Sequence, residues 1–283
     1  MKCKYCKSEN TIKYGKSNGK QCYYCKDCNH KFVDNGKFVK MRTKKEVIVA
    51  ALDLYFEGLS VRKVKRQLGN ILKVDVSQMA IWKWVVKYSE LAKKFVDSIK
   101  LEIEGDWHVD ETAIKCDGEH RWFWEMIDNE TKFLMATHLS GERSIKETLK
   151  FFRQAKARSE KRPDKIIVDG LWSYKKAFNK VFYSRYKKHR VEFVRKAGIR
   201  ARENNNVIER LHGTLKDRIN VMRGLRDEET AKTVLNGWFV FYNFIRPHQS
   251  LDGETPAKTA GIDLEIDGWH EMIETATEYT VKN

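Results

Sequence analysis

Three carboxylates, Asp110, Asp169 and Glu209, are candidates for a catalytic metal site. Asp110, in Trp-His-Val-Asp-Glu-Thr, and Asp169, in Ile-Ile-Val-Asp-Gly, lie within or at the end of short apolar runs that predict strands. An unpaired carboxylate is costly there. Glu209 lies in a segment that predicts a helix. Two strand carboxylates and one helix carboxylate can converge on a pair of divalent cations that clamp both reacting oxygens of a phosphodiester. These residues therefore predict a metal-dependent enzyme acting on DNA.

The neighbouring Glu111 is a competing candidate. Side chains alternate between the two faces of a strand, so Asp110 and Glu111 point in opposite directions. We expect Asp110 rather than Glu111 to share a site with Asp169, which ends its strand at the edge where open α/β sheets place ligands. Taken singly, each carboxylate could be an ordinary surface or capping residue, and Asp169 before Gly170 could be a turn residue.

Five of the six cysteines fall within the first 28 residues, as Cys3-Lys-Tyr-Cys6 and Cys22-Tyr-Tyr-Cys25-Lys-Asp-Cys28. In a reducing compartment, paired Cys-x-x-Cys spacings indicate a tetrahedral zinc site. Five thiols are available for four zinc-ligand positions. The Cys-x-x-Cys spacing of a zinc knuckle favours Cys3, Cys6, Cys25 and Cys28, which leaves Cys22 as a strand residue. The segment has few aliphatic residues, so metal binding would supply much of its folding free energy.

Residues 43–96 show apolar positions at three- and four-residue spacing and predict three helices. Gly58 ends the first, and Ser60 and Ser77 can cap the second and third. A short second helix before a longer third resembles a helix-turn-helix unit, whose third helix would enter the major groove of DNA. The alternative is a plain helical linker with a solvated face. The polar residues that this third helix would present to DNA are Ser77, Gln78, Lys83 and Lys87.

The region from residue 107 onward mixes strands with helices. Three consecutive strands with turns at Asp117-Gly118 and Asp128-Asn129 predict an antiparallel meander. The later segments alternate between helix and strand and end in a long helix, so the order predicts a mixed α/β sheet flanked by helices. The predicted elements are strands at 107–115, 121–127, 132–138, 165–168 and 191–194, and helices at about 144–157, 174–181 and from 205.

The chain has 283 residues and a net charge of +16, distributed unevenly. Residues 1–45 carry thirteen Lys or Arg against three acidic residues, and residues 185–202 carry eight against one, whereas the last twenty residues are acidic. This asymmetry is typical of a protein with a polyanion across one face. The apolar runs are too short to span a bilayer, and the N-terminus is unlike a signal peptide. We therefore expect no membrane partner and a cytoplasmic, nucleoid-associated protein.

The order of these motifs resembles the RNase H-like DDE transposases and integrases of bacterial and archaeal insertion sequences, over roughly residues 107–260. The N-terminal segments resemble the end-recognition module of that family. One feature departs from it: the interval from Asp169 to Glu209 is longer than usual. Glu203 would shorten the interval but lacks the flanking Asn-Asn and the later lysine. The motifs are Trp-x-x-Asp110-Glu-Thr, Asp169-Gly, Asn205-Asn206-x-x-Glu209-Arg210, Lys216, and Tyr242-Asn-Phe-Ile-Arg-Pro247-His248.

The resemblance implies an α/β fold with an RNase H-like mixed sheet, preceded by a zinc ribbon and a helix-turn-helix domain. The implied units are residues 1–40 for the ribbon, 41–100 for the helix-turn-helix, 101–262 for the catalytic core and 263–283 for an acidic tail. Asp110, Asp169 and Glu209 would hold two Mg²⁺ or Mn²⁺ ions, and the cysteines one structural Zn²⁺. The partners would be double-stranded DNA, as element ends and target, and a second copy of the chain, forming a dimer on DNA.

Further residues are candidates for contacts with DNA. Seven residues are almost two helical turns, so Lys216 lies on nearly the same face as Glu209 and could line a groove for the DNA backbone. Arg210, which follows Glu209, is a further candidate for DNA binding. Trp172 and Tyr174 could stack on an unpaired base or pack in the core. Two other functions stay open: a transposase-derived DNA-binding regulator that no longer cuts, and an RNase H-like host nuclease.

Overall fold

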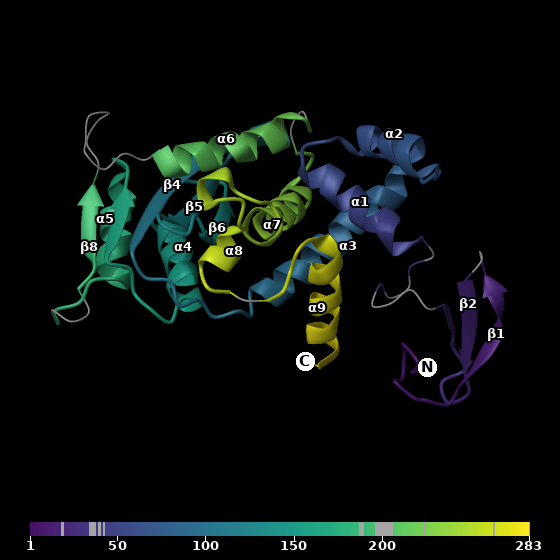
Figure 1. Ribbon diagram of the computed structural model, residues 1–283. Helices are drawn as coiled ribbons and strands as arrows, with labels where there is room; N and C mark the ends of the chain where they lie inside the picture. The colour runs from purple at the N-terminus through teal and green to yellow at the C-terminus, as the bar shows by residue number, and fades with distance from the viewer. Residues whose placement is uncertain are drawn as a thin grey trace.

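The computed structural model describes residues 1–17, 20–33, 38, 41, 43–186, 190–195, 206–222, 225–262 and 264–282. Its first element is a small antiparallel sheet of β1 (Thr11–Ser17), β2 (Lys20–Cys25) and β3 (Lys31–Val33). In the part of this segment that the structure describes, the buried apolar cluster consists of Cys3, Cys25 and Phe32. So small a cluster agrees with a segment that needs more than apolar burial to fold. The sheet lies at the opposite end of the molecule from β8 (Figure 1).

The three predicted helices are confirmed. Gly58 has a φ of +107° just after the first helix, a conformation that favours glycine. The hydroxyl of Ser60 accepts a hydrogen bond from the amide of Lys63, and that of Ser77 accepts one from the amide of Ala80, so both serines act as N-caps. The helices are α1 (Lys45–Phe56), α2 (Val61–Leu72) and α3 (Gln78–Val96).

The predicted mixed sheet is confirmed as well, with the strand order β6-β5-β4-β7-β8. The first three strands in the chain form an antiparallel meander, and β7 and β8 continue the sheet parallel to β4. Asp117 and Gly118 both have positive φ, which makes the tight turn between β4 and β5. The strands are β4 (Asp106–Cys116), β5 (Glu119–Asp128), β6 (Leu134–Ser140), β7 (Lys165–Val168) and β8 (Glu192–Arg195).

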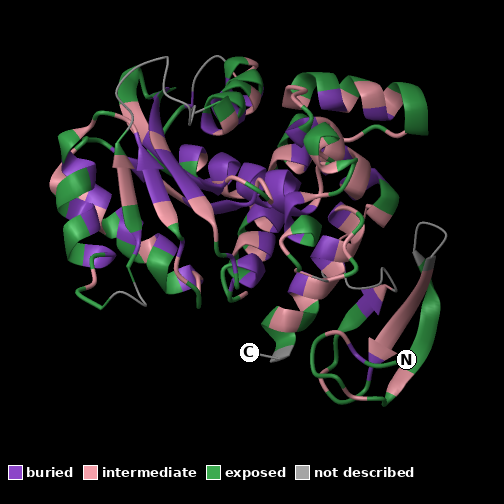
Figure 2. Cartoon of the chain, turned by 60° about the vertical axis from the view of Figure 1, so that its left-hand side comes forward, coloured by how far each residue is buried: buried purple, intermediate pink, exposed green. Residues whose placement is uncertain are grey.

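Helices cover both faces of this sheet. The face that carries Glu111 and Trp124 meets α4 (Ile145–Arg158) and α5 (Trp172–Val181), since Trp124 contacts aromatic rings from both helices. The opposite face, with Asp110, meets α6 (Asn206–Asn220), which runs across β4 and β5 (Figure 1). Figure 2 shows that buried residues follow the central strands and the inner sides of the helices.

Helix α7 (Glu228–Phe244) joins the sheet to the helical region. It packs against α3 and against β6. At Gly237 a Cβ atom would overlap Ser89 of α3 and Phe56 of α1, so only glycine allows the helices to approach this closely. One continuous apolar core consequently extends from α1 and α3 into the sheet. The division of the chain into separate units remains a prediction.

The C-terminal segment is helical, although its charge suggested an acidic tail. The segment predicted as the tail, residues 263–283, contains α9 (Trp269–Lys282), which packs against α3 and α1. The short helices η2 (Gln249–Leu251) and α8 (Pro256–Thr259) precede it. The acidic residues Glu265, Asp267 and Glu278 are exposed, whereas the inner face of α9 carries apolar residues at helical spacing. The buried residues of α9 are Trp269, Met272, Ile273 and Ala276. Within the described ranges, no helix is both long and apolar enough to cross a membrane.

Candidate active site

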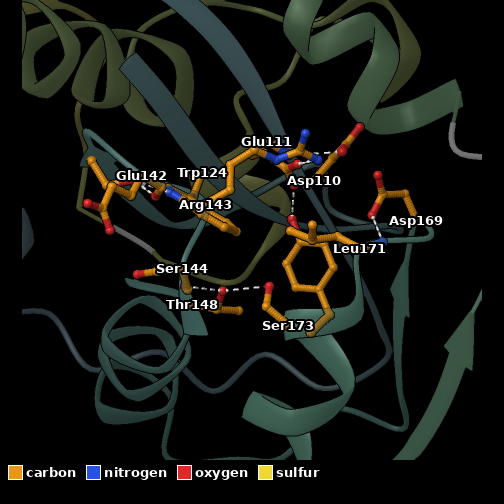
Figure 3. Close-up of polar contacts among 12 residues, drawn as sticks. Asp110, Glu111, Trp124, Glu142, Arg143, Ser144, Thr148, Asp169, Leu171 and Ser173 are labelled. Atoms are coloured by element: carbon orange, nitrogen blue, oxygen red, sulfur yellow. Dashed lines mark hydrogen bonds and ion pairs between the residues drawn. The ribbon is translucent and has the colours of Figure 1, made fainter. Parts of the chain in front are cut away.

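Asp110 and Asp169 lie side by side at the carboxyl edge of β7. The last pair of the parallel ladder joins Val109 of β4 to Val168 of β7, so Asp169 stands one residue beyond it, next to Asp110. Oδ1 of Asp169 accepts a hydrogen bond of 2.9 Å from the amide of Leu171, and Oδ1 of Asp110 accepts one of 2.9 Å from the amide of Glu111. These backbone contacts orient both carboxylates toward the strand edge (Figure 3).

Glu111 belongs to the same cluster. Carboxylate oxygens of Asp110, Glu111 and Asp169 lie within 4.8 Å of one another. The expectation that Glu111 would point away from Asp169 is therefore wrong. Because β7 ends at Val168, the described part of the chain has no strand beside Asp110 and Glu111 on the β7 side of β4, and both carboxylates can approach Asp169 around this edge.

Both oxygens of Glu111 already have protein partners. The hydroxyl of the buried Tyr174 donates a hydrogen bond to Oε2, and the guanidinium of Arg143 pairs with Oε1 (Figure 3). Arg143 is itself held over the ring of Trp122, with 4.3 Å from its guanidinium carbon to the ring centroid. The Glu111 side chain is 2% exposed, and burial raises its pKa to about 7, with Asp169 adding to the effect. Glu111 is thus fixed in place by Tyr174 and Arg143.

Glu209 approaches the site from α6 without entering this cluster. It lies in the first turn of the helix and is exposed. Burial raises the pKa of Asp110, and the negative charges of Asp169 and Glu209 raise it further, so Glu209 lies within electrostatic range of Asp110. The structure thus brings Asp110 and Asp169 together and places Glu209 near them. The alternative residue, Glu203, lies outside the described residues.

A histidine and a buried glutamate, both missed in the sequence analysis, stand behind Asp110. Oε2 of Glu125 is 2.8 Å from Nε2 of His212, and Nδ1 of His212 is 3.9 Å from Oδ2 of Asp110. Burial lowers the pKa of His212, but Glu125 and Asp110 outweigh this effect and raise it. Two signals could have identified the pair: a glutamate inside the aromatic strand Trp-Phe-Trp-Glu-Met, and the pairing of Glu125 opposite Asp110.

The predicted DNA-contacting residues are mostly exposed. Trp172 is 57% exposed, with Lys176 Nζ 4.6 Å from the centroid of its ring. Tyr174 is completely buried, so its core interpretation is correct and base stacking by it is excluded. Lys216 is exposed, and its charge reaches Glu125. The remaining candidates are Arg210, Ser77, Gln78 and Lys83, which are exposed, and Lys87, which lies over the ring of Tyr88.

Four cysteine sulfurs gather at the N-terminal sheet. The Sγ atoms of Cys3, Cys6, Cys25 and Cys28 lie within 4.8 Å of one another, with 3.5 Å between Cys3 and Cys28 and between Cys6 and Cys25. Tetrahedral zinc with bonds of about 2.3 Å would separate sulfurs by about 3.8 Å, whereas a disulfide would need about 2.0 Å. This spacing fits a metal site. Cys22, in β2, lies outside the cluster.

Comparison with known proteins identifies the family. The model of a family described as a DDE domain matches residues 104–248, just over half of the chain. The match includes Asp110, Asp169 and Glu209. The chain belongs to the DDE transposases. A DDE transposase is a metal-dependent enzyme of DNA cleavage and transfer, and the carboxylate cluster supplies the hard oxygen donors that divalent cations prefer.

More distant similarities accompany the family match. An uncharacterized protein of Methanocaldococcus jannaschii, MJ0017, is 25% identical to the transposase over 221 residues, which cover 76% of this chain and 94% of the relative. A chain of the simian T-cell lymphotropic virus intasome, in complex with PP2A regulatory subunit B56 gamma, is 13% identical with a TM-score of 0.43; the match covers 57% of this chain and 56% of that one. The HTLV-2 integrase catalytic core domain in complex with magnesium is 14% identical with a TM-score of 0.43, covering 58% and 99%. Family membership rests on the DDE-domain match.

Proposed function

We propose that this transposase binds the ends of an insertion sequence and cuts and joins DNA with Asp110, Asp169 and Glu209 as its catalytic carboxylates. The observation that carries this proposal is the convergence of Asp110 and Asp169 at the edge of the sheet. The donor set consists of carboxylates only, which suits Mg²⁺ or Mn²⁺. Burial and neighbouring negative charges raise the pKa of Asp110, so a bound cation would relieve an unfavourable charge.

Each carboxylate has its own task in this proposal. Asp110 and Asp169 would hold two divalent cations jointly, and Glu209 would complete one coordination shell. When bound, the cations would supply Lewis-acid stabilisation of the attacking and leaving oxygens. Glu111 is not assigned as a third metal-binding residue, because Tyr174 and Arg143 already occupy both of its oxygens. It would instead fix the position of β4 beside Asp169.

The N-terminal residues would provide recognition of DNA. One Zn²⁺ held by Cys3, Cys6, Cys25 and Cys28 would stabilise the ribbon, and α3 would enter the major groove through its exposed polar residues. The strongly basic N-terminal sequence favours contact with phosphates. A dimer in the cytoplasm, bound to nucleoid DNA, would hold two element ends together.

The test is cleavage of the DNA that flanks the gene. Purified full-length protein and Mg²⁺ should nick that DNA at a defined position, whereas Asp169→Asn should not. Glu192→Gln is the matched control, because Glu192 is an exposed carboxylate of β8 in the same sheet. Specific binding by the wild type with no cleavage under any divalent metal would instead favour the transposase-derived regulator.

A further inference from the structure

A cationic cavity of about 550 Å³ adjoins α6 close to Glu209. Three separate segments supply its charges: Lys132 from the turn between β5 and β6, Arg210 from α6, and Arg246 from the segment just after α7. Thr214 and Ser250 add hydroxyl groups. Among the described residues that line it, none is an aspartate or glutamate. The composition therefore suits an anion.

The two guanidinium charges of this cavity are poorly compensated. Among the parts of the chain that the structure describes, no ion pair involves Arg210 or Arg246. The Lys132 ammonium donates to the carbonyl of Asn129 rather than to a carboxylate. Burial lowers the pKa of Lys132; the nearby carboxylates Asp128 and Glu130 oppose this effect, whereas the charge of Arg210 adds to it. The described lining brings like charges together without a carboxylate, so an anion that entered the cavity would reduce their mutual repulsion.

His248 also lines this cavity, and its pKa would respond to a bound anion. Burial lowers the pKa of His248 to about 4, and the charge of Arg246 contributes. Its Nε2 lies 3.2 Å from the carbonyl oxygen of Tyr242, and its ring meets the Tyr242 ring edge-on. His248 is consequently neutral near pH 7 and stands at the wall of the cavity, where it can report the arrival of a negative charge.

The cavity flanks the course that DNA would take along α6. Arg210 follows Glu209 directly, so it projects about 100° around the helix from it. Lys216 lies almost two turns beyond Glu209 on nearly the same face as Glu209. Asn206 and Val207, in the first turn of α6, also line the cavity, and the amides of a first helical turn favour an anion.

We propose that this cavity binds a phosphodiester group of the DNA that leaves the active site along α6. The inference rests on the proposed function, because it assigns the cavity to the DNA substrate. The two guanidinium groups can donate paired hydrogen bonds to phosphate oxygens, and Lys132 supplies a third positive charge. DNA held here would be fixed on the opposite flank of α6 from His212.

The first experiment measures affinity against salt. Full-length wild type and the variants Arg246→Gln, Lys132→Gln and Arg210→Gln, with zinc retained at the cysteines, are titrated with a fluorescent duplex of the flanking sequence without Mg²⁺ or Mn²⁺, which prevents cleavage. Each variant should bind several-fold more weakly, and its plot of log affinity against log salt should be shallower by about one charge. Lys180→Gln is the control, since Lys180 is exposed at the far end of α5. Unchanged slopes in all three variants would overturn the inference.

The second experiment observes the cavity directly. The imidazole signals of ¹³C-histidine-labelled protein are followed by NMR against pH with and without the same duplex, and His248→Gln assigns the signal. Bound DNA should raise the pKa of His248 from about 4 toward its ordinary value. An unmoved signal at saturating DNA would refute the cavity as a phosphate site, even if the wild type cleaves DNA. A shifted signal in a protein that cleaves nothing would uphold the cavity and contradict the proposed function.

Discussion

Nε2 of His212 lies 2.8 Å from Oε2 of the fully buried Glu125, and its other ring nitrogen faces Asp110 at 3.9 Å. His212 therefore lies between Glu125, in the interior of the sheet, and Asp110, at the predicted metal site. A buried carboxylate is strongly disfavoured without a partner, so Glu125 and His212 depend on each other. Through His212, this pair can hold the orientation of Asp110.

Glu125→Gln should therefore weaken metal binding at Asp110 with little loss of stability. The amide keeps the volume of the glutamate and removes a buried charge, but it no longer holds His212 as an ion partner. Loss of such a supporting contact typically reduces metal affinity by 10–100-fold. Calorimetric titration with Mn²⁺ measures the change. Glu119→Gln, at the exposed start of β5, is the control, and equal affinities in the two variants would exclude a positioning role for Glu125.

Glu209 and Glu111 should differ in what they contribute. Glu209→Gln should abolish cleavage and leave DNA binding within a few-fold, because only the catalytic charge is lost. Glu111→Gln should retain measurable cleavage, since Glu111 is held by Tyr174 and Arg143 and would not bind metal. Single-turnover cleavage assays decide between them. Normal cleavage by Glu209→Gln together with none by Glu111→Gln would make Glu111 the third catalytic carboxylate.

The cysteine cluster should bind one zinc ion per chain. Cys25→Ser should release the metal and unfold the N-terminal sheet while the central core stays folded, because the small apolar cluster of this segment cannot replace the metal. Cys22→Ser should retain zinc, since Cys22 lies outside the cluster. Metal analysis and hydrogen exchange of both variants provide the measurement. Zinc loss in Cys22→Ser but not in Cys25→Ser would contradict the assigned ligands.

His248 should make the protein less stable in acid. Its pKa is about 4 in the folded protein and about 6.5 when unfolded, so the unfolded chain binds more protons between these values. The free energy of unfolding should consequently rise with pH from about 4 to 6.5. After allowance for solvent screening, the contribution is roughly 1–2 kcal/mol. Urea unfolding of the wild type and His248→Gln at pH 5 and pH 7 tests this. The difference in the free energy of unfolding between the two proteins should change with pH. The same difference at both pH values would be inconsistent with a buried neutral histidine.

The sequence predicted local features more reliably than long-range contacts. The caps at Ser60 and Ser77, the turn at Asp117-Gly118 and the position of Asp169 after β7 all follow from short-range rules. By contrast, the role of α9 depends on packing against α3, which its acidic composition did not reveal. The contact between Glu111 and Asp169 depends on where β7 ends relative to β4, and strand alternation alone does not specify that relationship.

The most direct test of the central claim is the number of Mn²⁺ ions that the transposase binds beside a pre-cleaved DNA end. The claim is that Asp110 and Asp169 jointly hold the catalytic cations. Electron paramagnetic resonance, with zinc retained at the cysteines, should detect two Mn²⁺ ions per active site in the wild type and loss of binding in Asp110→Asn and Asp169→Asn. The same Mn²⁺ occupancy in the wild type and both variants would contradict the account.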